Sequence, residues 1–368
     1  MTPTSVEVFA VEPTAAQLIV RSPTDGPHEL AVGDGTWTAE VHDGITAVEV
    51  DDLEPYAMYA LSLDGQPAGE FRTLPPPPGR YLGRFATVSD LHIGETGFGH
   101  VPRFTSDTDY THAHPVVALR AAVRELAAWG SQGLVVKGDL THDCRAKEFD
   151  LAASILATYP GPLRVMPGNH DGGNHNHDDG VPVLAAHGLE LQWATRSAVL
   201  GGLNVVMVNT VRRGHEHGYP PSDDDPVFEL IRDAPSMVLI HHQLMTTRLP
   251  YYVPFGVPKG PARDFLGRLA SVNPAVLLSS GHTHRHRRRR YGPIAITEVG
   301  SVKDHPGTWA GYLVYEGGVV QVVRRIADST VLVWTERTRR NAMGAWGRWS
   351  PGRLEDRSFS HAWPNGTR

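Results

Sequence analysis

Met166-Pro167-Gly168-Asn169-His170-Asp171 closes the apolar run 163–166 and opens a polar loop. A run of strand length that stops at Pro-Gly and continues with Asn, His and Asp is typical of a buried strand that delivers polar groups into a loop. Binding and catalytic residues are often found on loops that a rigid strand positions. The stretch therefore predicts a functional site at the end of a strand.

Four other strand-like runs end in the same manner. The endings are Asp90 and His92 after 85–88, Asp139 after 134–136, His241 and His242 after 237–240, and His282 and His284 after 275–278. Asp, His and Asn offer oxygen and nitrogen ligands that suit divalent manganese, iron or zinc, and none of these endings offers a thiolate. The pattern predicts a two-metal site.

Any one of these endings alone is more often a turn or a helix cap than a metal ligand. The five together read, in order, Asp-x-His, Gly-Asp, Gly-Asn-His-Asp, His-His and Gly-His-x-His. This order resembles the calcineurin-like metallophosphoesterase superfamily over about residues 80–300. The Asp-x-His form, with Gly-Asn-His-Asp and Gly-His-Thr-His, is most similar to the cyclic-nucleotide phosphodiesterase-like branch.

The resemblance implies a pair of divalent or mixed-valence metal ions, drawn from manganese, iron and zinc. Seven side chains would hold them: Asp90, His92 and His284 on one ion, Asn169, His241 and His282 on the other, and Asp139 bridging both. Of the two neighbouring histidines after 237–240, His241 is chosen because the family's ligand is usually the first. His170 would be the catalytic residue that protonates the leaving alkoxide or stabilises its charge.

Two positions depart from the family pattern. Many members place an Asp three residues after the bridging Asp, where it orients the histidine at the position of His170. This chain has His142 there and Asp143 one residue later, so either Asp143 or another group must orient His170. Asp171 is a further candidate for support of the site or contact with substrate. The second departure is His242-Gln243 where relatives often have His-Pro.

A long segment, 94–114, follows the first motif and is rich in Gly, Thr, Asp and His. A loop of this length inside a compact domain is usually a lid or a binding loop. We expect it to form part of the substrate rim. His100 is a candidate for contact with substrate, although a single loop histidine is more often only solvated.

Helical and strand patterns alternate between 85 and 166, with helices expected near 115–130 and 146–159. This predicts parallel βαβ units, whose ligands would meet at the carboxyl edge of the sheet. Too many strands follow for one sheet, so we expect two sheets packed face to face with helices outside. The superfamily resemblance implies an α/β fold of the four-layer αββα type.

Residues 1–74 carry short alternating runs separated by Asp-Gly turns, which predict a small all-β sandwich. Leu53-Glu54-Pro55 with Tyr59, and the closing run 71–75, resemble the tyrosine corner and last strand of a fibronectin type III domain. We expect three parts: the sandwich with its Pro-rich linker in 1–78, the metallophosphoesterase domain in 79–325, and a C-terminal extension in 326–368 that packs on the catalytic domain.

The composition narrows the choice of partners. A net charge of −6 provides no general attraction to nucleic acid, so nucleic acid is not expected as a partner. The sequence shows no membrane span and no secretory signal, which predicts a cytoplasmic protein. The Arg- and Trp-rich tail from 326 onward is either a nucleic-acid surface or a segment packed on the core, and the second interpretation is favoured.

The leading function is hydrolysis of a phosphodiester, a cyclic nucleotide or another small diester, with two metal ions that activate a shared water molecule. The alternative is a phosphomonoesterase or nucleotidase, because the same metals serve both reactions. A third interpretation is a metal-binding or interaction protein without activity. The expected partner is a small phosphoester substrate, and the oligomeric state stays open.

Overall fold

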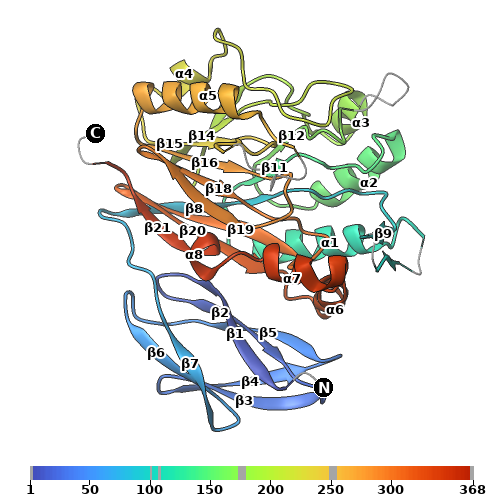
Figure 1. The fold of residues 1–368 in the computed structure, drawn as a ribbon, viewed down its shortest axis with the longest axis vertical. Coiled ribbons are helices and arrows are strands. Elements are labelled where there is room, and N and C mark those ends of the chain that lie inside the picture. Colours follow the sequence, from blue (N-terminus) through green and yellow to red (C-terminus); the bar gives the residue numbers. More distant parts are fainter. Residues whose placement is uncertain (1–2, 100–101, 107–108, 173–179, 248–254, 365–368) are drawn as a thin grey trace.

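The computed structural model describes residues 3–99, 102–106, 109–172, 180–247 and 255–364. His100, the candidate in the rim loop, lies outside the described residues. Across the described part of the chain, no helix combines the length and apolar character needed to cross a membrane. Figure 1 shows a small all-β domain at the N-terminus beneath a larger α/β domain.

The N-terminal domain consists of two facing antiparallel sheets. The first has the order β1 (Ser5–Val11), β2 (Ala16–Arg21), β5 (Ile45–Val50), and the second β4 (Gly35–Val41), β3 (Gly26–Val32), β6 (Met58–Leu63), β7 (Gln66–Arg72). Leu18, Leu30 and Val41 lie in one buried cluster between them. The Tyr59 hydroxyl accepts a hydrogen bond from the Glu54 amide at 2.7 Å, as a tyrosine corner does. The region is consistent with the predicted sandwich.

The first large sheet of the α/β domain carries the ligand-bearing strands of the first half of the chain. Its order is β12 (Leu163–Met166), β11 (Leu134–Lys137), β8 (Tyr81–Val88), β19 (Thr308–Tyr315), β20 (Gly318–Arg325), β21 (Phe359–Ala362). Strands β8, β11 and β12 are parallel. Their connections contain α1 (His114–Ala128) and α2 (Ala146–Leu156), so the predicted βαβ units are present.

The second large sheet carries the remaining ligand-bearing strands. Its order is β13 (Arg196–Leu200), β14 (Leu203–Met207), β15 (Ser236–Leu239), β16 (Val276–Ser280), β18 (Ile294–Glu298), β17 (Arg287–Tyr291). Strands β14, β15, β16 and β18 are parallel. The helices on this side are α4 (Val227–Leu230) and α5 (Lys259–Val272).

Three buried clusters hold four layers together. On β11, Leu134 and Val136 pack towards α1 and α2, whereas Val135 between them packs towards the second sheet. On β15, Met237 faces the first sheet and Val238 faces α4 and α5. Alternate residues of each strand thus serve two different cores, as expected for sheets buried on both faces. The predicted four-layer αββα arrangement is confirmed.

Several short elements complete the chain. They are β9 (Gly97–Phe98), β10 (Phe104–Thr105), α3 (Gly180–Ala186), α6 (Ser329–Thr338), a 3₁₀ turn (Asn341–Gly344), α7 (Ala345–Trp349) and α8 (Leu354–Arg357). The C-terminal strand β21 pairs with β20 at the edge of the first sheet. Trp334 and Trp363 are buried, whereas Trp349 is 38% exposed.

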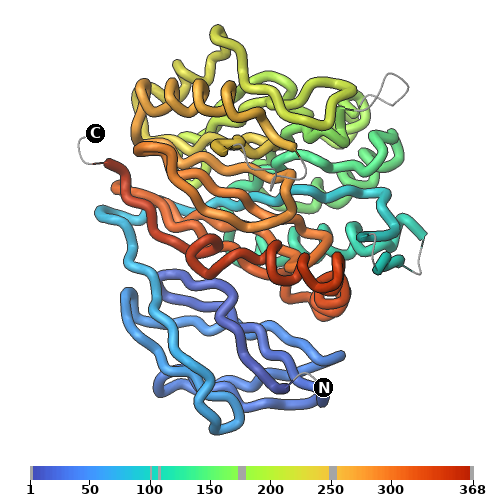
Figure 2. Tube along the Cα trace, viewed as in Figure 1, coloured from blue at the N-terminus to red at the C-terminus, as the bar shows by residue number. Residues whose placement is uncertain are grey.

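The N-terminal domain docks on this C-terminal region. Strand β1 lies against β20 and α8, and β5 lies against α6; Figures 1 and 2 show the blue domain meeting the red end of the chain. Ile19 and Val322 share a buried apolar cluster across the contact. The Gln17 side chain accepts from the Arg325 amide at 2.7 Å and donates to its carbonyl at 2.9 Å. The domain is therefore joined by a packed interface as well as by the linker.

Candidate metal centre

The strand ends place the seven predicted metal ligands in one region. Asp90 and His92 follow β8, Asp139 follows β11, Asn169 follows β12, His241 follows β15, and His282 and His284 follow β16. Within each sheet these strands run parallel, so their carboxyl ends lie at the same edge. The structure brings side chains from both sheets into contact at that edge.

The first group of ligand atoms lies between Asp90, His92, His284 and Asp139. Nε2 of His92 is 3.2 Å from Nε2 of His284 and 3.5 Å from Oδ2 of Asp139. Nε2 of His284 is 3.5 Å from Oδ1 of Asp90. Two ligands held tetrahedrally about 2.1 Å from one ion lie roughly 3.4 Å apart, so this spacing suits a single cation.

The second group uses the same Asp139 oxygen. Nε2 of His241 is 3.3 Å from Oδ2 of Asp139 and 3.0 Å from Oδ1 of Asn169. Nε2 of His282 is buried and has no hydrogen-bond partner within the described ranges of the chain. Because Oδ2 of Asp139 faces both groups, this carboxylate occupies the position of a bridge.

Hydrogen bonds on the far side of two rings show which nitrogen is free for a metal. Nδ1 of His284 donates to Oδ2 of Asp304 at 2.7 Å, and Nδ1 of His241 donates to the Lys137 carbonyl at 2.8 Å. In the neutral form of each ring, Nε2 therefore carries a lone pair instead of a proton. These lone pairs face other acceptor atoms, and a bound cation would stabilise that arrangement. Metal-binding histidines almost always have such a partner on the other nitrogen. The donor set fits a metal pair.

Electrostatics agree with this reading of the donor set. Burial lowers the pKa of His241, but the Asp139 carboxylate, the Asp90 carboxylate and the Lys137 carbonyl together outweigh burial and raise this pKa to about 9. Burial, together with His241, lowers the pKa of His282 to about 3. The surroundings of the His241 ring therefore attract positive charge. The His282 ring is held in the neutral form, which is the form that binds metal.

Five of the candidate ligands have strained backbone conformations. Positive φ angles are found at Asp90 (57°), His92 (47°), Asp139 (53°), His282 (67°) and His284 (50°). Non-glycine residues rarely adopt this region, and such strain persists where the surroundings impose it, most often at functional sites. The strain is a signal of function that no sequence motif reveals.

His242, the neighbour of His241, is directed elsewhere. Its Nε2 donates to the Glu216 carbonyl at 3.2 Å, and its Nδ1 lies 2.9 Å from the Thr210 hydroxyl. Both ring nitrogens of His242 thus have protein partners. This supports the choice of His241 as the ligand.

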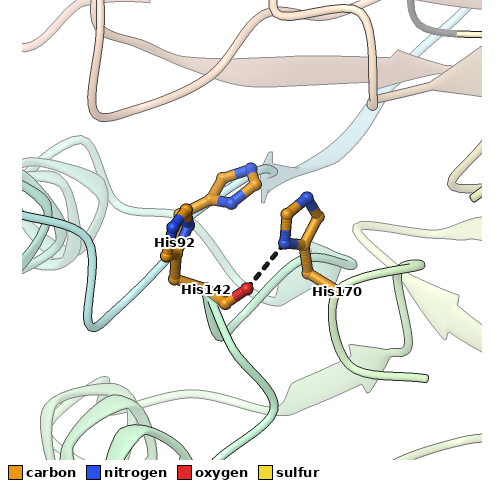
Figure 3. Close-up of side chains that lie close together, drawn as sticks. All are labelled: His92, His142 and His170. Atoms are coloured by element: carbon orange, nitrogen blue, oxygen red, sulfur yellow. Dashed lines mark hydrogen bonds between the residues drawn. The ribbon is translucent and has the colours of Figure 1, made fainter. Parts of the chain in front are cut away.

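His170 is oriented by the main chain. Its Nδ1 donates to the His142 carbonyl at 2.7 Å, as Figure 3 shows, and its amide donates to Oδ1 of Asp139 at 3.0 Å. Asp143 instead pairs with Arg145 at 3.0 Å. The group that orients His170 is therefore the backbone oxygen of residue 142. The side chains of His142 and Asp143 are not needed for this role.

Asp171 ties together two loops that carry candidate ligands. Its buried carboxylate accepts hydrogen bonds from the amides of Gly168 at 2.8 Å, Leu140 at 3.1 Å and Thr141 at 3.0 Å. The Thr141 hydroxyl adds a fourth bond at 2.9 Å. Asp171 thus positions the loops of Asp139 and Asn169 and does not reach out towards a substrate.

Replacement of this carboxylate should destabilise the chain. Asp171→Ala leaves several buried donors without an acceptor, and we expect the free energy of unfolding to fall by about 3–5 kcal/mol. Urea unfolding of the metal-free chain measures it. Asp143→Ala is the matched control, because its surface pair with Arg145 is worth only about 0–1 kcal/mol. Equal stability of the two variants would contradict the proposal that Asp171 holds the two loops together.

Two supporting groups carry no recognisable sequence signal. Asp304 fixes the His284 ring, and Lys303 beside it forms a buried ion pair with Glu95 in the rim segment. Both residues follow β18, which ends in no ligand motif of its own. Only the pairing of strands shows that this loop reaches the centre.

A model of the calcineurin-like phosphoesterase family matches residues 83–286, more than half of the 368-residue chain. The chain belongs to this family. The match begins within β8 and ends two residues after His284, so it includes every strand end with a candidate ligand. Family members use dinuclear metal sites, which agrees with the two groups of donor atoms. A search of curated proteins found no match.

The chain is similar to several solved structures at low sequence identity. A protein of Thermus thermophilus is 11% identical, with 67% of this chain and 99% of that one covered and a TM-score of 0.40. Zinc-complexed Vps29 of Entamoeba histolytica is 14% identical, with 67% and 93% covered and a TM-score of 0.33. A phosphopantetheinyl hydrolase of Mycobacterium tuberculosis is 16% identical, with 61% and 91% covered and a TM-score of 0.34.

Proposed function

We propose that this chain is an active metal-dependent phosphoric ester hydrolase, and that its substrate is a small phosphodiester such as a cyclic nucleotide. The observation that carries the proposal is the completeness of the site. Two groups of donor atoms share one carboxylate oxygen, and an oriented histidine lies beside them.

Seven residues would hold the metal pair. Asp90, His92 and His284 would bind one ion, Asn169, His241 and His282 the other, and Asp139 both. When bound, the ions would lower the pKa of a water molecule from about 15.7 towards about 7 and withdraw charge from the phosphoryl oxygens. Asn169 supplies a neutral oxygen, which adds no negative charge to its group.

His170 would deliver a proton to the leaving oxygen. Its Nδ1–H is held by the His142 carbonyl, so Nε2 is the atom that faces outward from this bond. In the imidazolium form, Nε2 carries the proton that a departing alkoxide requires. The carbonyl fixes the ring without competing for that proton.

The neighbouring cations support a diester over a monoester. Nζ of Lys137 is buried and donates to Oγ of Ser279 at 3.1 Å and to the Ser280 carbonyl at 2.9 Å. Lys303 is also buried and pairs with Glu95. Neither lysine is exposed to a substrate oxygen. A diester carries one negative charge fewer than a monoester, so it needs less help from such side chains.

Parallel turnover assays test the proposal. The full chain, loaded with Mn²⁺, is assayed on bis(4-nitrophenyl) phosphate and on 4-nitrophenyl phosphate. We expect the diester to have the higher kcat/KM. A higher kcat/KM for the monoester would select the phosphatase alternative, and no metal-dependent turnover of either ester would select a non-catalytic family member.

A further inference from the structure

Three histidines form a separate cluster at the edge of the metal centre. His92, His142 and His170 each offer one ring nitrogen, and these three atoms lie within 4.8 Å of one another. Ring centroids of His92 and His170 are 4.5 Å apart, and those of His142 and His170 are 5.7 Å apart with the rings nearly parallel. Figure 3 shows the three rings drawn together from separate loops.

Each ring has a nitrogen available to a ligand. Nδ1 of His170 is bonded to the His142 carbonyl, so Nε2 of His170 remains. Nδ1 of His142 and Nδ1 of His92 are shielded from solvent and have no hydrogen-bond partner among the residues that the structure describes. The His92 side chain is only 6% exposed, so this nitrogen lies deep in the protein. A buried polar atom without a partner costs about 1–3 kcal/mol, which a bound ligand would remove.

The cluster shares His92 with the first group already described, and a site that uses Nδ1 of His92 would differ from that group in the nitrogen it takes. His92 contributes to those groups through Nε2, which faces His284 and Asp139. Its Nδ1 lies on the other side of the same ring. The side chain of His142 has no place in either group, because only its carbonyl acts on His170.

We propose that His92, His142 and His170 bind a third divalent cation of the imidazole-preferring class, with Zn²⁺ as the clearest example. Three imidazoles without a carboxylate suit zinc, copper or nickel and are poor ligands for magnesium or manganese. Nitrogens held tetrahedrally on one zinc ion lie roughly 3.4 Å apart, so rings whose nitrogens lie within 4.8 Å of one another would have to move closer by up to about 1.4 Å. Binding at Nδ1 of His92 releases the proton of that nitrogen.

Occupation of this site would inhibit hydrolysis. The third ion takes up Nε2 of His170, and the histidine then has no proton to deliver to the leaving oxygen. This second part rests on the proposed function, whereas binding of the ion does not. Zinc in excess of the catalytic pair should therefore bind and inhibit, and manganese should not.

Zinc counting tests the binding. The full chain is stripped with a chelator, saturated with Zn²⁺, freed of unbound metal and analysed for zinc per chain. His142→Phe retains the backbone carbonyl but removes the imidazole, and it should bind one equivalent fewer than the wild type. His142→Gln should give the same loss and serves if the first variant misfolds. His112→Phe, a change at a 70% exposed ring in the neighbouring segment, should bind as the wild type does.

Equal zinc contents in the wild type and both His142 variants would overturn the third site. An activity measurement on the same samples tests the inhibition. With the catalytic pair filled, excess Zn²⁺ should lower wild-type turnover at least tenfold and leave His142→Phe unchanged. Equal inhibition of both overturns the link to His170. Zinc loss in His142→Phe without any turnover in the wild type would uphold the site and refute the proposed function instead.

Discussion

Asp139→Asn should abolish hydrolysis and lower the metal content of the chain. Oδ2 of Asp139 lies 3.5 Å from Nε2 of His92 and 3.3 Å from Nε2 of His241, so one oxygen serves both groups of ligands. An amide removes the negative charge from both ions at once. We expect kcat/KM to fall by more than about 10³-fold, since loss of metal catalysis costs several kcal/mol and each 1.36 kcal/mol is tenfold.

Metal analysis and diester turnover on the same preparation measure both effects. Asp143→Asn is the matched control, because it changes a carboxylate four residues away that pairs with Arg145 on the surface. The control should retain its metals and its turnover. Full occupancy by two metals with normal turnover in Asp139→Asn would remove Asp139 from the bridge.

His170→Ala should keep both metals and lose rate. The side chain lies beside the candidate ligands and is held by the His142 carbonyl, so its removal leaves the ligand set in place. General acid–base assistance is worth about 10²-fold to 10⁴-fold, and a loss of this size in kcat is expected for poor leaving groups.

The leaving group provides the control for this role. A nitrophenolate departs without a proton, whereas an alkoxide needs one, so the loss in His170→Ala should be small for nitrophenyl diesters and large for alkyl diesters. Metal content, measured by mass spectrometry, should match the wild type. Equal losses on the two esters would argue against proton delivery by His170.

The ligand-bearing half of the fold is predictable because each strand is an apolar run that stops at its ligands. Strands β11, β15 and β16 are buried throughout, and β8 and β12 are buried over the residues that lead to their ligands. Strands buried on both faces have sequences with a continuous apolar character. The edge strand β17 is different. It reads Arg-Arg-Arg-Arg-Tyr, and it is a strand because its backbone pairs with β18. No apolar pattern marks it.

The sequence predicts which residues form the candidate site. It predicts less well how their side chains are arranged and supported. Motif order predicts the seven ligands, and the structure brings their side chains together at one edge. The partner of His170 is a backbone oxygen, which every residue has, so no side-chain pattern could reveal it. Asp304 is brought to His284 by the loop after β18, a contact that depends on tertiary structure alone. The strained φ angles of Asp90 and Asp139 likewise belong to the folded state.

The most direct test of the dinuclear centre is anomalous diffraction from crystals of the full chain loaded with Mn²⁺. We expect two peaks. One should lie among Asp90, His92 and His284 and the other among Asn169, His241 and His282, with a carboxylate oxygen of Asp139 in contact with both. A single peak, or peaks away from these residues in fully loaded and active protein, would contradict this expectation.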